Sequence, residues 1–320
     1  MSFKDIKGQD SSLELLRRAI QEDSVAKAYL FSGPEGIGKR RAALEFAKAV
    51  NCRDNDADSC GECGCCLKID NNRHPDVRLI EGESGTIRID DIRQMQREIN
   101  LRPYDAQLKV YIIDNAHNLN AESSNALLKT LEEPPAHSVI VLVSSKPSLL
   151  FKTVISRCQI VRFYPLGRDR LEGILKSEYG LDVSRAHFLS YFCEGRIGDA
   201  LRLKDAGFYQ EKNRVIDDFL TSRHSVAPAV SVSQTREGLH RDINILIGWF
   251  RDICFLKTGM AGEELINFDR RNELAMMAQD YTQEQLSGIF DFLSEAHLRI
   301  DQNVNLKLLT SNLKAELWKG

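Results

Sequence analysis

The stretch "AYLFSGPEGIGKRRAALEFA" (residues 28–47) places a short apolar run, a glycine-rich turn and a helical pattern in succession. Gly33, Gly38 and Lys39 satisfy the spacing G-x-x-x-x-G-K, and Gly36 adds a further glycine. Such a loop directs backbone N–H groups and the helix N-terminus at phosphate, while the lysine reaches the terminal phosphates. The stretch therefore predicts a nucleotide-binding α/β module. A glycine turn with a purely structural role is the alternative.

The same region lacks parts that ATP hydrolysis requires. Position 40 should carry a hydroxyl that ligates Mg²⁺, but the sequence has the cation Arg40 there. The run "KVYIID" (109–114) ends at Asp114, which could hold Mg²⁺ through water, but the next residue is Asn115 where a glutamate would activate the attacking water. His117 could be proposed as a replacement base, although a solvated or capping histidine is the simpler interpretation. We therefore expect a phosphate cradle without ATPase activity.

Short apolar runs of strand length alternate with helical patterns from residue 9 to about residue 163. The runs are rich in Val and Ile and barely alternate with polar residues, as expected for strands covered on both faces. This order predicts a parallel α/β sheet. The expected strands are residues 28–33, 77–80, 109–114, 138–145 and 159–163. The expected helices are residues 12–20, 41–50, 89–99 and 121–133.

Strand patterns stop after residue 163, and residues 168–320 show helical patterns. The polar segment "TSRHSVAPAVSVSQTREG" (221–238) predicts a loop or hinge. Two apolar stripes predict helices that face a core. The first stripe is Ile289, Phe292, Leu293, Ala296 and Ile300, and the second is Leu306, Leu309, Leu313 and Leu317.

Composition describes a water-soluble chain with more than one domain. The 320 residues are 42% hydrophobic and 28% charged, with a net charge of −3, and a chain of this length usually forms two or more domains. No apolar stretch approaches the roughly 20 residues that span a bilayer, and "MSFKDIKGQD" (1–10) lacks the apolar core of a signal peptide. We therefore expect a cytoplasmic protein. Contact with nucleic acid would need a local basic face or partner chains.

A cysteine cluster predicts a metal site. Cys52, Cys60, Cys63 and Cys66 read C-x7-C-x2-C-x2-C, and two C-x2-C steps can wrap one tetrahedral Zn²⁺ as thiolates. Cys65 breaks this rhythm and is expected to be spare. Four thiolates leave no open position, which favours a structural role; redox sensing is the alternative. The remaining cysteines are scattered and are expected to be buried thiols: Cys158, Cys193 and Cys254.

Three segments together resemble the ATPase module of bacterial DNA polymerase III clamp loaders, within the AAA+ superfamily. They are "FSGPEGIGK" (31–39), "VYIIDNAHNLNAESSNALLKTLEEPP" (110–135) and "TVISRCQIVRF" (153–163). In addition, "FKDIKGQD" (3–10) resembles the segment that lies against adenine in such modules. The resemblance implies an AAA+-like P-loop domain at residues 1–165 with a zinc knuckle at 52–66. It also implies a helical lid domain at 166–208 and a helical collar domain for oligomerisation at 209–320.

The departures from the loader pattern resemble its non-hydrolysing stator class. Motor subunits carry an arginine directly before "DAL", whereas this chain reads "GRIGDALRL" (195–203) with Gly198 there. The resemblance implies partnership with the gamma/tau motor and delta subunits, the sliding clamp and, through the assembled complex, primer–template DNA within a DNA polymerase III holoenzyme. It implies that Arg157 of the "SRC" motif is an arginine finger in trans. ATP or ADP would bind weakly without hydrolysis, on Gly33, Gly36, Gly38, Lys39 and Asp114.

Two other interpretations compete with the stator. An active ATPase motor of the same superfamily would need replacements for the missing base and metal ligand at Asn115 and Arg40. A zinc-dependent nucleic-acid-binding module is opposed by charge, because the residues around the cysteines, "NCRDNDADSCGECGCCLKID" (51–70), are net acidic and would repel phosphate.

Overall fold

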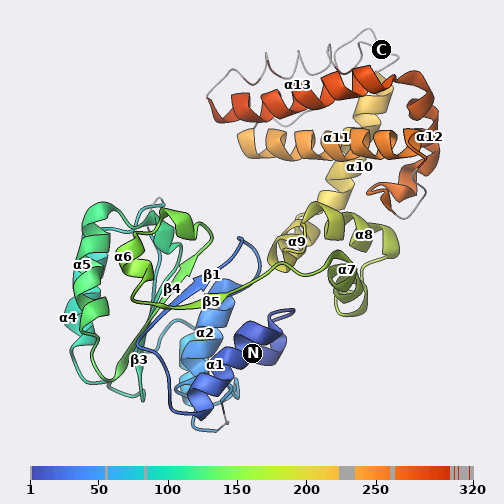
Figure 1. Ribbon diagram of the computed structural model, residues 1–320. Helices are drawn as coiled ribbons and strands as arrows, with labels where there is room; N and C mark the ends of the chain where they lie inside the picture. Colours follow the sequence, from blue (N-terminus) through green and yellow to red (C-terminus); the bar gives the residue numbers. More distant parts are fainter. Residues whose placement is uncertain are drawn as a thin grey trace. The chain divides into compact units, whose positions relative to one another are not determined.

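The computed structural model of the chain describes residues 2–54, 57–82, 85–222, 235–259 and 264–302, together with residues 306, 309 and 317. The chain divides into two compact units, of which the first is Met1–Leu166 with Gly195–Asp199 and the second is Gly167–Glu194 with Ala200–Gly320. The first unit is an α/β unit and the second is helical (Figure 1). The separate lid and collar domains, divided after residue 208, stay a prediction.

Five parallel strands form the sheet of the first unit, in the order β2-β3-β4-β1-β5. Because parallel strands end at the same edge, the segments that follow β1 and β3 leave the sheet on either side of β4. Each strand lies within one residue of its predicted bounds, which confirms the predicted parallel sheet. The strands are β1 (Ala28–Ser32), β2 (Val77–Ile80), β3 (Lys109–Ile113), β4 (Ser138–Ser144) and β5 (Gln159–Arg162).

Helices cover both faces of this sheet, as the nearly continuous apolar strands predicted. α1 (Asp10–Gln21) and α2 (Lys39–Ala49) pack over one face, where Tyr29 and Phe31 point. Residues of α4 (Ile89–Ile99), α5 (Ala121–Glu132) and α6 (Lys152–Ile155) pack over the other face, where Leu30 points. Figure 1 shows the two helical layers on opposite sides of the strands. Shorter elements of this unit are η1 (Phe3–Asp5), α3 (Gly64–Asp70), η2 (Ala116–Asn118) and η3 (Pro147–Leu149).

The described part of the second unit contains helices and no strand. Its elements are α7 (Arg168–Ser177), α8 (Val183–Phe192), most of α9 (Ile197–Asp205), α10 (Phe208–Ser222), α11 (Arg236–Lys257), η5 (Phe268–Arg270), α12 (Arg271–Asp280) and α13 (Gln283–Asp301). None of the helices in the described ranges has the length and apolarity that crossing a membrane requires. Among the scattered cysteines, Cys193 is buried, whereas Cys158 and Cys254 are half-buried rather than buried as expected.

The two predicted apolar stripes have different outcomes. On α13 the stripe faces the core, with Ile289, Leu293, Ala296 and Ile300 buried and Phe292 partly exposed. In the second stripe, Leu309 and Leu317 are buried, Leu306 is half-buried and Leu313 lies outside the described residues. The predicted hinge at 221–238 also lies mostly outside them, since α10 ends at Ser222 and α11 begins at Arg236.

A buried carboxylate fixes the chain that enters β3. Asp76, 3% exposed, accepts hydrogen bonds from the backbone N–H groups of Tyr104 (2.9 Å), Asp105 (2.8 Å) and Ala106 (3.0 Å). Burial alone would raise the pKa of Asp76, but these three N–H groups favour the ionised form and the net effect lowers it. This contact therefore helps to position the segment that leads into β3.

We expect Asp76→Asn to lower the free energy of unfolding by about 1–2 kcal/mol at pH 7, because an ionised acceptor makes stronger hydrogen bonds than an amide. The folded-state pKa lies below the unfolded value of about 3.9. The stabilisation is therefore complete above that value and is lost as the pH falls through the folded-state pKa. Urea unfolding at several pH values should show a constant gap between wild type and variant down to about pH 4 and a narrowing gap below it. The exposed Asp291 supplies the control variant Asp291→Asn, and a pH-independent gap for Asp76→Asn would contradict this role.

Candidate nucleotide loop and metal centre

The glycine loop joins β1 to α2, as the sequence predicted. Gly33 follows β1 and donates its N–H to the carbonyl oxygen of Ser144 at the end of β4 (3.3 Å). Gly36 and Gly38 have φ of +75° and +95°, a left-handed conformation that side chains rarely adopt. Gly38 is the N-cap of α2. The loop thus takes the strand-to-helix turn that can present backbone N–H groups to an anion.

Lys39 faces the loop from the first residue of α2. Its side chain is only 6% exposed, and Nζ donates to the carbonyl oxygen of Pro34 within the loop. Burial lowers the pKa of Lys39 to about 8, although the nearby carboxylates of Asp114 and Glu35 oppose this effect. A buried ammonium group inside a glycine loop is placed to meet a phosphate, which would satisfy its charge.

Arg40 forms ion pairs at the edge of the sheet where strands end. Its NH1 atom pairs with Glu81, directly after β2, and lies 3.6 Å from Oδ2 of Asp114, directly after β3. Asp114 is 8% exposed, and its Oδ1 accepts the N–H of Asn115 (2.9 Å). The carboxylate that would hold Mg²⁺ therefore faces a guanidinium. Sequence reasoning missed Glu81, although its place at the end of the strand beside β3 was a usable signal.

Asn115 occupies the position at which a glutamate would act as the general base. Asn115 has φ of +49° and is the N-cap of η2. His117 is half-buried, with Nδ1 3.3 Å from Ser144 Oγ. Burial, together with the cations Lys146 and Lys39, lowers its pKa, so the ring is neutral at pH 7. A neutral imidazole can accept a proton, which makes His117 the candidate base of the active-ATPase alternative.

The segment 195–199 lies directly against the glycine loop. Gly198 donates its N–H to the carbonyl oxygen of Gly36 (2.7 Å). The carboxylate of Asp199, 8% exposed and paired with Arg196 (2.9 Å), packs beside Gly36. A Cβ atom on Gly198 would lie 2.7 Å from that carbonyl oxygen. A side chain at position 198, such as the arginine implied for motor subunits, therefore requires the backbone to shift.

The four cysteines predicted to bind metal lie together. The Sγ atoms of Cys52, Cys60, Cys63 and Cys66 are all within 4.8 Å of one another, with 3.9 Å between Cys60 and Cys66. A tetrahedral Zn²⁺ with bonds of about 2.3 Å would place its sulfur atoms about 3.8 Å apart. Cys65 is outside the cluster and packs against the apolar core, as predicted for the spare cysteine.

Backbone N–H groups point at the sulfur atoms of this cluster. Cys60 donates to Cys52 Sγ (3.4 Å), and Cys63 donates to Cys60 Sγ (3.2 Å). The N–H groups of Glu62 and Cys63 lower the pKa of the Cys60 thiol to about 7, whereas burial raises the pKa of Cys52 and Cys66. Buried thiolates need a compensating cation, so the arrangement can hold a thiophilic metal ion.

Arg157 lies at the opposite edge of the sheet from the glycine loop. β1 and β5 run parallel, with Tyr29 opposite Gln159 and Ser32 opposite Arg162. Arg157 precedes β5 and so belongs to the edge where strands begin, whereas the loop follows the end of β1. A four-residue strand separates the two edges by roughly 13 Å. The structure therefore does not bring Arg157 together with the loop of its own chain.

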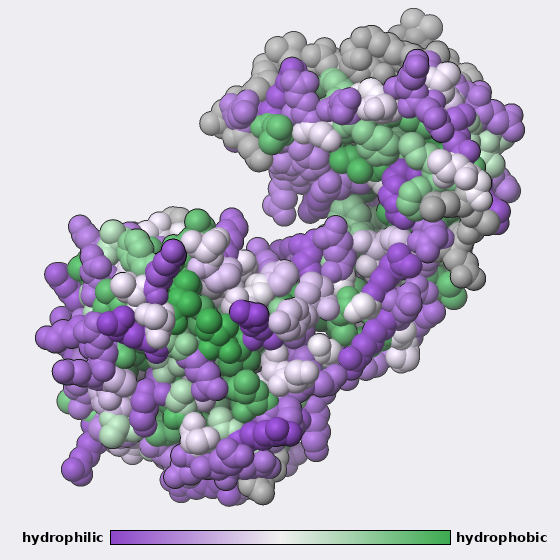
Figure 2. Space-filling model, viewed as in Figure 1, coloured by the Kyte–Doolittle hydropathy of each residue, from purple (hydrophilic) through white to green (hydrophobic). Residues whose placement is uncertain are grey.

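The Arg157 guanidinium has partners that the sequence reasoning did not identify. Its NH2 atom donates to Glu132 Oε1 (2.7 Å), and NH1 donates to the carbonyl oxygen of Thr153 (3.0 Å). Residues close to Arg157 in the sequence expose apolar side chains: Leu149, Phe151 and Ile160 are 63%, 44% and 41% exposed. Figure 2 shows apolar residues gathered on the visible face of this unit, in the region of β4 and β5 in Figure 1.

The comparison with known proteins gives two matching family models. The model described as DNA polymerase III, delta subunit matches residues 8–167, and the model described as DNA polymerase III, delta subunit, C terminal matches residues 206–315. The crystal structure of a DNA polymerase III gamma subunit-related protein from Thermotoga maritima is similar, with a TM-score of 0.48 and 22% identity, over 96% of this chain and 99% of that one.

Curated relatives are similar over the length of the chain. DNA polymerase III subunit delta' of Bacillus subtilis (strain 168) is 29% identical over 98% of this chain and 97% of the relative. DNA polymerase III subunit tau of the same organism is 30% identical over 92% of this chain, which spans 57% of that relative. Since the first family model alone matches half of the chain, the chain belongs to the delta-prime family of DNA polymerase III clamp-loader subunits.

Proposed function

We propose that the chain is the non-hydrolysing stator of a bacterial replicative clamp loader in the cytoplasm. The stator helps the gamma/tau motor and delta subunits to load the sliding clamp on primer–template DNA, which it meets through the assembled complex. The observation that carries this proposal is the pairing of Arg40 with Asp114 and Glu81. Family membership and similarity to delta' over nearly the whole chain support it.

Three features of the loop oppose hydrolysis by independent means. Arg40 replaces the hydroxyl ligand of Mg²⁺ and neutralises the carboxylate at the end of β3. Asn115 cannot accept a proton from water. Gly198 is held against Gly36 and offers no cation to the γ-phosphate. The loop retains the backbone shape and the lysine of a phosphate cradle, so weak ATP or ADP binding without turnover is the activity it supports.

We expect no steady-state ATPase activity from the isolated chain. Loss of a catalytic base alone typically lowers rates by a factor of about 10² to 10⁴. Arg40→Thr combined with Asn115→Glu restores the hydroxyl and the carboxylate, and should raise single-turnover hydrolysis of Mg²⁺–ATP above the wild-type background. His117→Ala in the wild type is the control. Turnover like that of a motor subunit, abolished by His117→Ala, would favour the active-ATPase alternative.

The position of Arg157 supports a role as an arginine finger in trans. The sheet keeps it away from its own loop, and the exposed apolar side chains nearby suit an interface with another subunit. Its ion pair with Glu132 is exposed, with side chains 35% and 51% exposed, and pairs of this kind contribute about 0–1 kcal/mol. A γ-phosphate of a neighbouring subunit, which accepts charge-assisted hydrogen bonds from a planar guanidinium, could therefore displace the carboxylate.

In a loader reconstituted from purified subunits, Arg157→Ala should reduce clamp- and DNA-stimulated ATP hydrolysis and clamp loading. Arginine fingers contribute roughly 10³ to 10⁵ in rate elsewhere, but one finger among several active sites should lower the turnover of the whole complex only in part. Assembly, measured by native mass, should be unchanged. Arg73→Ala, at an exposed arginine after α3, is the matched control. Full hydrolysis and loading by the assembled Arg157→Ala complex would assign this residue a structural role only.

We propose that the four-cysteine cluster binds one structural Zn²⁺ per chain. Cys60→Ser combined with Cys63→Ser should abolish zinc retention in metal analysis and lower the melting temperature, because thiolate sites contribute directly to folding. Cys65→Ser should leave zinc retention unchanged, since this thiol lies outside the cluster, and should alter the melting temperature much less than the double variant does. Zinc retained by the double variant would contradict the ligand assignment. Full stability after metal removal, with reversible disulfide formation, would instead favour the redox alternative.

A further inference from the structure

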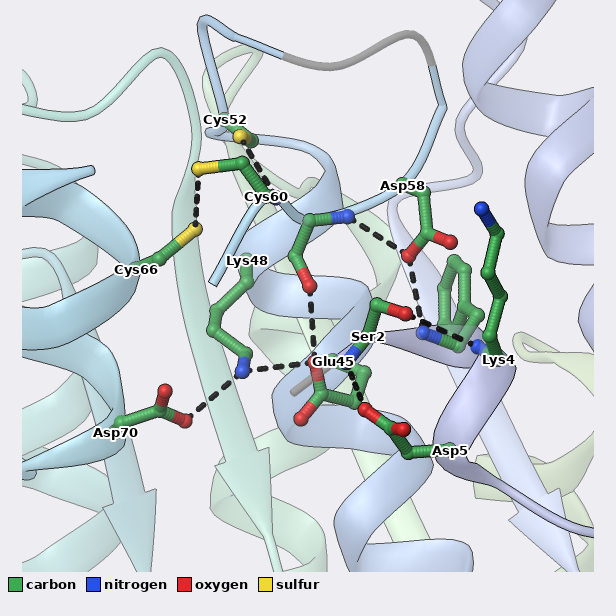
Figure 3. A network of polar contacts seen from close by, with 12 residues as sticks. Ser2, Lys4, Asp5, Glu45, Lys48, Cys52, Asp58, Cys60, Cys66 and Asp70 are labelled. Carbon is green, nitrogen blue, oxygen red and sulfur yellow. Dashed lines mark hydrogen bonds and ion pairs between the residues drawn. The ribbon is translucent and has the colours of Figure 1, made fainter. Parts of the chain in front are cut away.

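One buried carboxylate joins the cysteine segment to the N-terminal segment. Asp58, 6% exposed, lies two residues before Cys60. Its Oδ1 accepts the N–H of Phe3 (2.9 Å) and the N–H of Ser59 (2.8 Å), while Oδ2 lies 3.4 Å from NH2 of Arg17 on α1. Figure 3 shows this carboxylate between the labelled cysteines and the labelled residues of η1. The same oxygen therefore serves two parts of the chain that are far apart in sequence.

The N-terminal segment, residues 2–6, reaches from Asp58 to the glycine loop. Phe3 is fully buried, and the segment closes a capping box in which Ser2 and Asp5 exchange hydrogen bonds with the backbone. Ile6, 6% exposed, packs in the same core, and a Cβ on Gly38 would lie 3.9 Å from its Cγ2. A displacement of this segment would therefore change the packing of Ile6 beside Gly38 of the loop.

A second branch anchors the cysteine segment to the helix that follows the loop. Ser59 Oγ donates to Glu45 Oε2 on α2 (3.0 Å). Glu45 pairs with the fully buried Lys48 (2.8 Å), which also pairs with Asp70 of α3 (2.9 Å). Figure 3 shows this chain of contacts beside the cysteines. Asp58 therefore contacts the N-terminal segment and α1, and Ser59 contacts α2. Both contacts depend on the position of the backbone at residues 58 and 59.

Regular secondary structure does not hold the described part of the cysteine segment before α3. These residues, 52–54 and 57–63, form neither helix nor strand. The hydrogen bonds to Sγ atoms hold them in the shape that gathers the four thiols. A metal ion bonded to all four sulfur atoms would fix that shape, whereas without the ion only these weak hydrogen bonds to sulfur hold the four cysteines together. The placement of Asp58 should therefore depend on the metal.

We propose that metal binding at the four cysteines orders the N-terminal segment through Asp58. Asp58 is a positioning residue, because it touches neither the metal nor a substrate. The metal centre then controls the residues that pack beside the glycine loop, in addition to stabilising its own segment. This proposal rests on the proposed metal site and is independent of whether nucleotide binds.

Amide hydrogen exchange of the full chain, with Zn²⁺ bound and after chelation, tests this coupling. The amides of Phe3, Asp5 and Ile6 are hydrogen-bonded in the structure. Chelation should speed their exchange by roughly tenfold, the effect of losing one or two hydrogen bonds, while exchange in α5 stays the same. A chain that binds no Zn²⁺ overturns the metal site and the coupling together. Zinc removal that leaves the exchange of these amides unchanged overturns only the coupling.

Variants at Asp58 separate positioning from metal binding. With saturating Zn²⁺, Asp58→Ala should keep one Zn²⁺ per chain. The amides of residues 3–6 in this variant should nevertheless exchange as fast as those of the chelated wild type. Asp58→Asn keeps an oxygen that can accept both N–H groups and should exchange like the wild type. Glu62→Ala removes an exposed carboxylate between two of the cysteines and is the matched control, with wild-type exchange. Slow exchange in zinc-loaded Asp58→Ala would overturn the role of Asp58.

Discussion

The parallel hydrogen bonding of five strands is the constraint on which the rest of the first unit depends. Because the strands run in the same direction, the residues directly after each strand lie at one edge and the residues directly before each strand lie at the other. The glycine loop, Asp114 and Glu81 share the first edge, and Arg157 belongs to the second. The two edges of this module can therefore carry different contacts, as the proposed stator role requires.

Charge neutralisation within the chain explains how a phosphate loop can persist without a metal. In a hydrolysing site, the carboxylate after β3 is compensated by Mg²⁺ that arrives with the nucleotide. Here the guanidinium of Arg40 supplies that positive charge permanently. The carboxylates of Asp114 and Glu81 at this edge of the sheet therefore have a positively charged partner when no ligand is bound. In the proposed stator role, the loop, the lysine and the sheet are retained for folding and assembly, and ATP hydrolysis belongs to the motor subunits.

Sequence reasoning located the elements and the ligands but not their partners. The strands were predicted to within one residue because buried parallel strands are continuous apolar runs with clear ends. The four cysteines were predicted because local spacing alone decides which thiols can surround one ion. Glu81, Glu132 and Asp58 were missed, because each is an ordinary acidic residue until the fold brings a distant cation or N–H group to it. Their roles depend on tertiary contacts that no short pattern encodes.

The close approach of Gly198 to the carbonyl oxygen of Gly36 has an evolutionary consequence. Where 2.7 Å separates a would-be Cβ from a backbone oxygen, no side chain can enter by a single substitution without moving the segment. An arginine at position 198 that reads the γ-phosphate would therefore require a shift of residues 195–199 as well as the substitution. The effect of an arginine at position 198 therefore depends on changes elsewhere in the segment. In the proposed stator, such a barrier makes the gain of motor function difficult, even though most of the nucleotide loop is present.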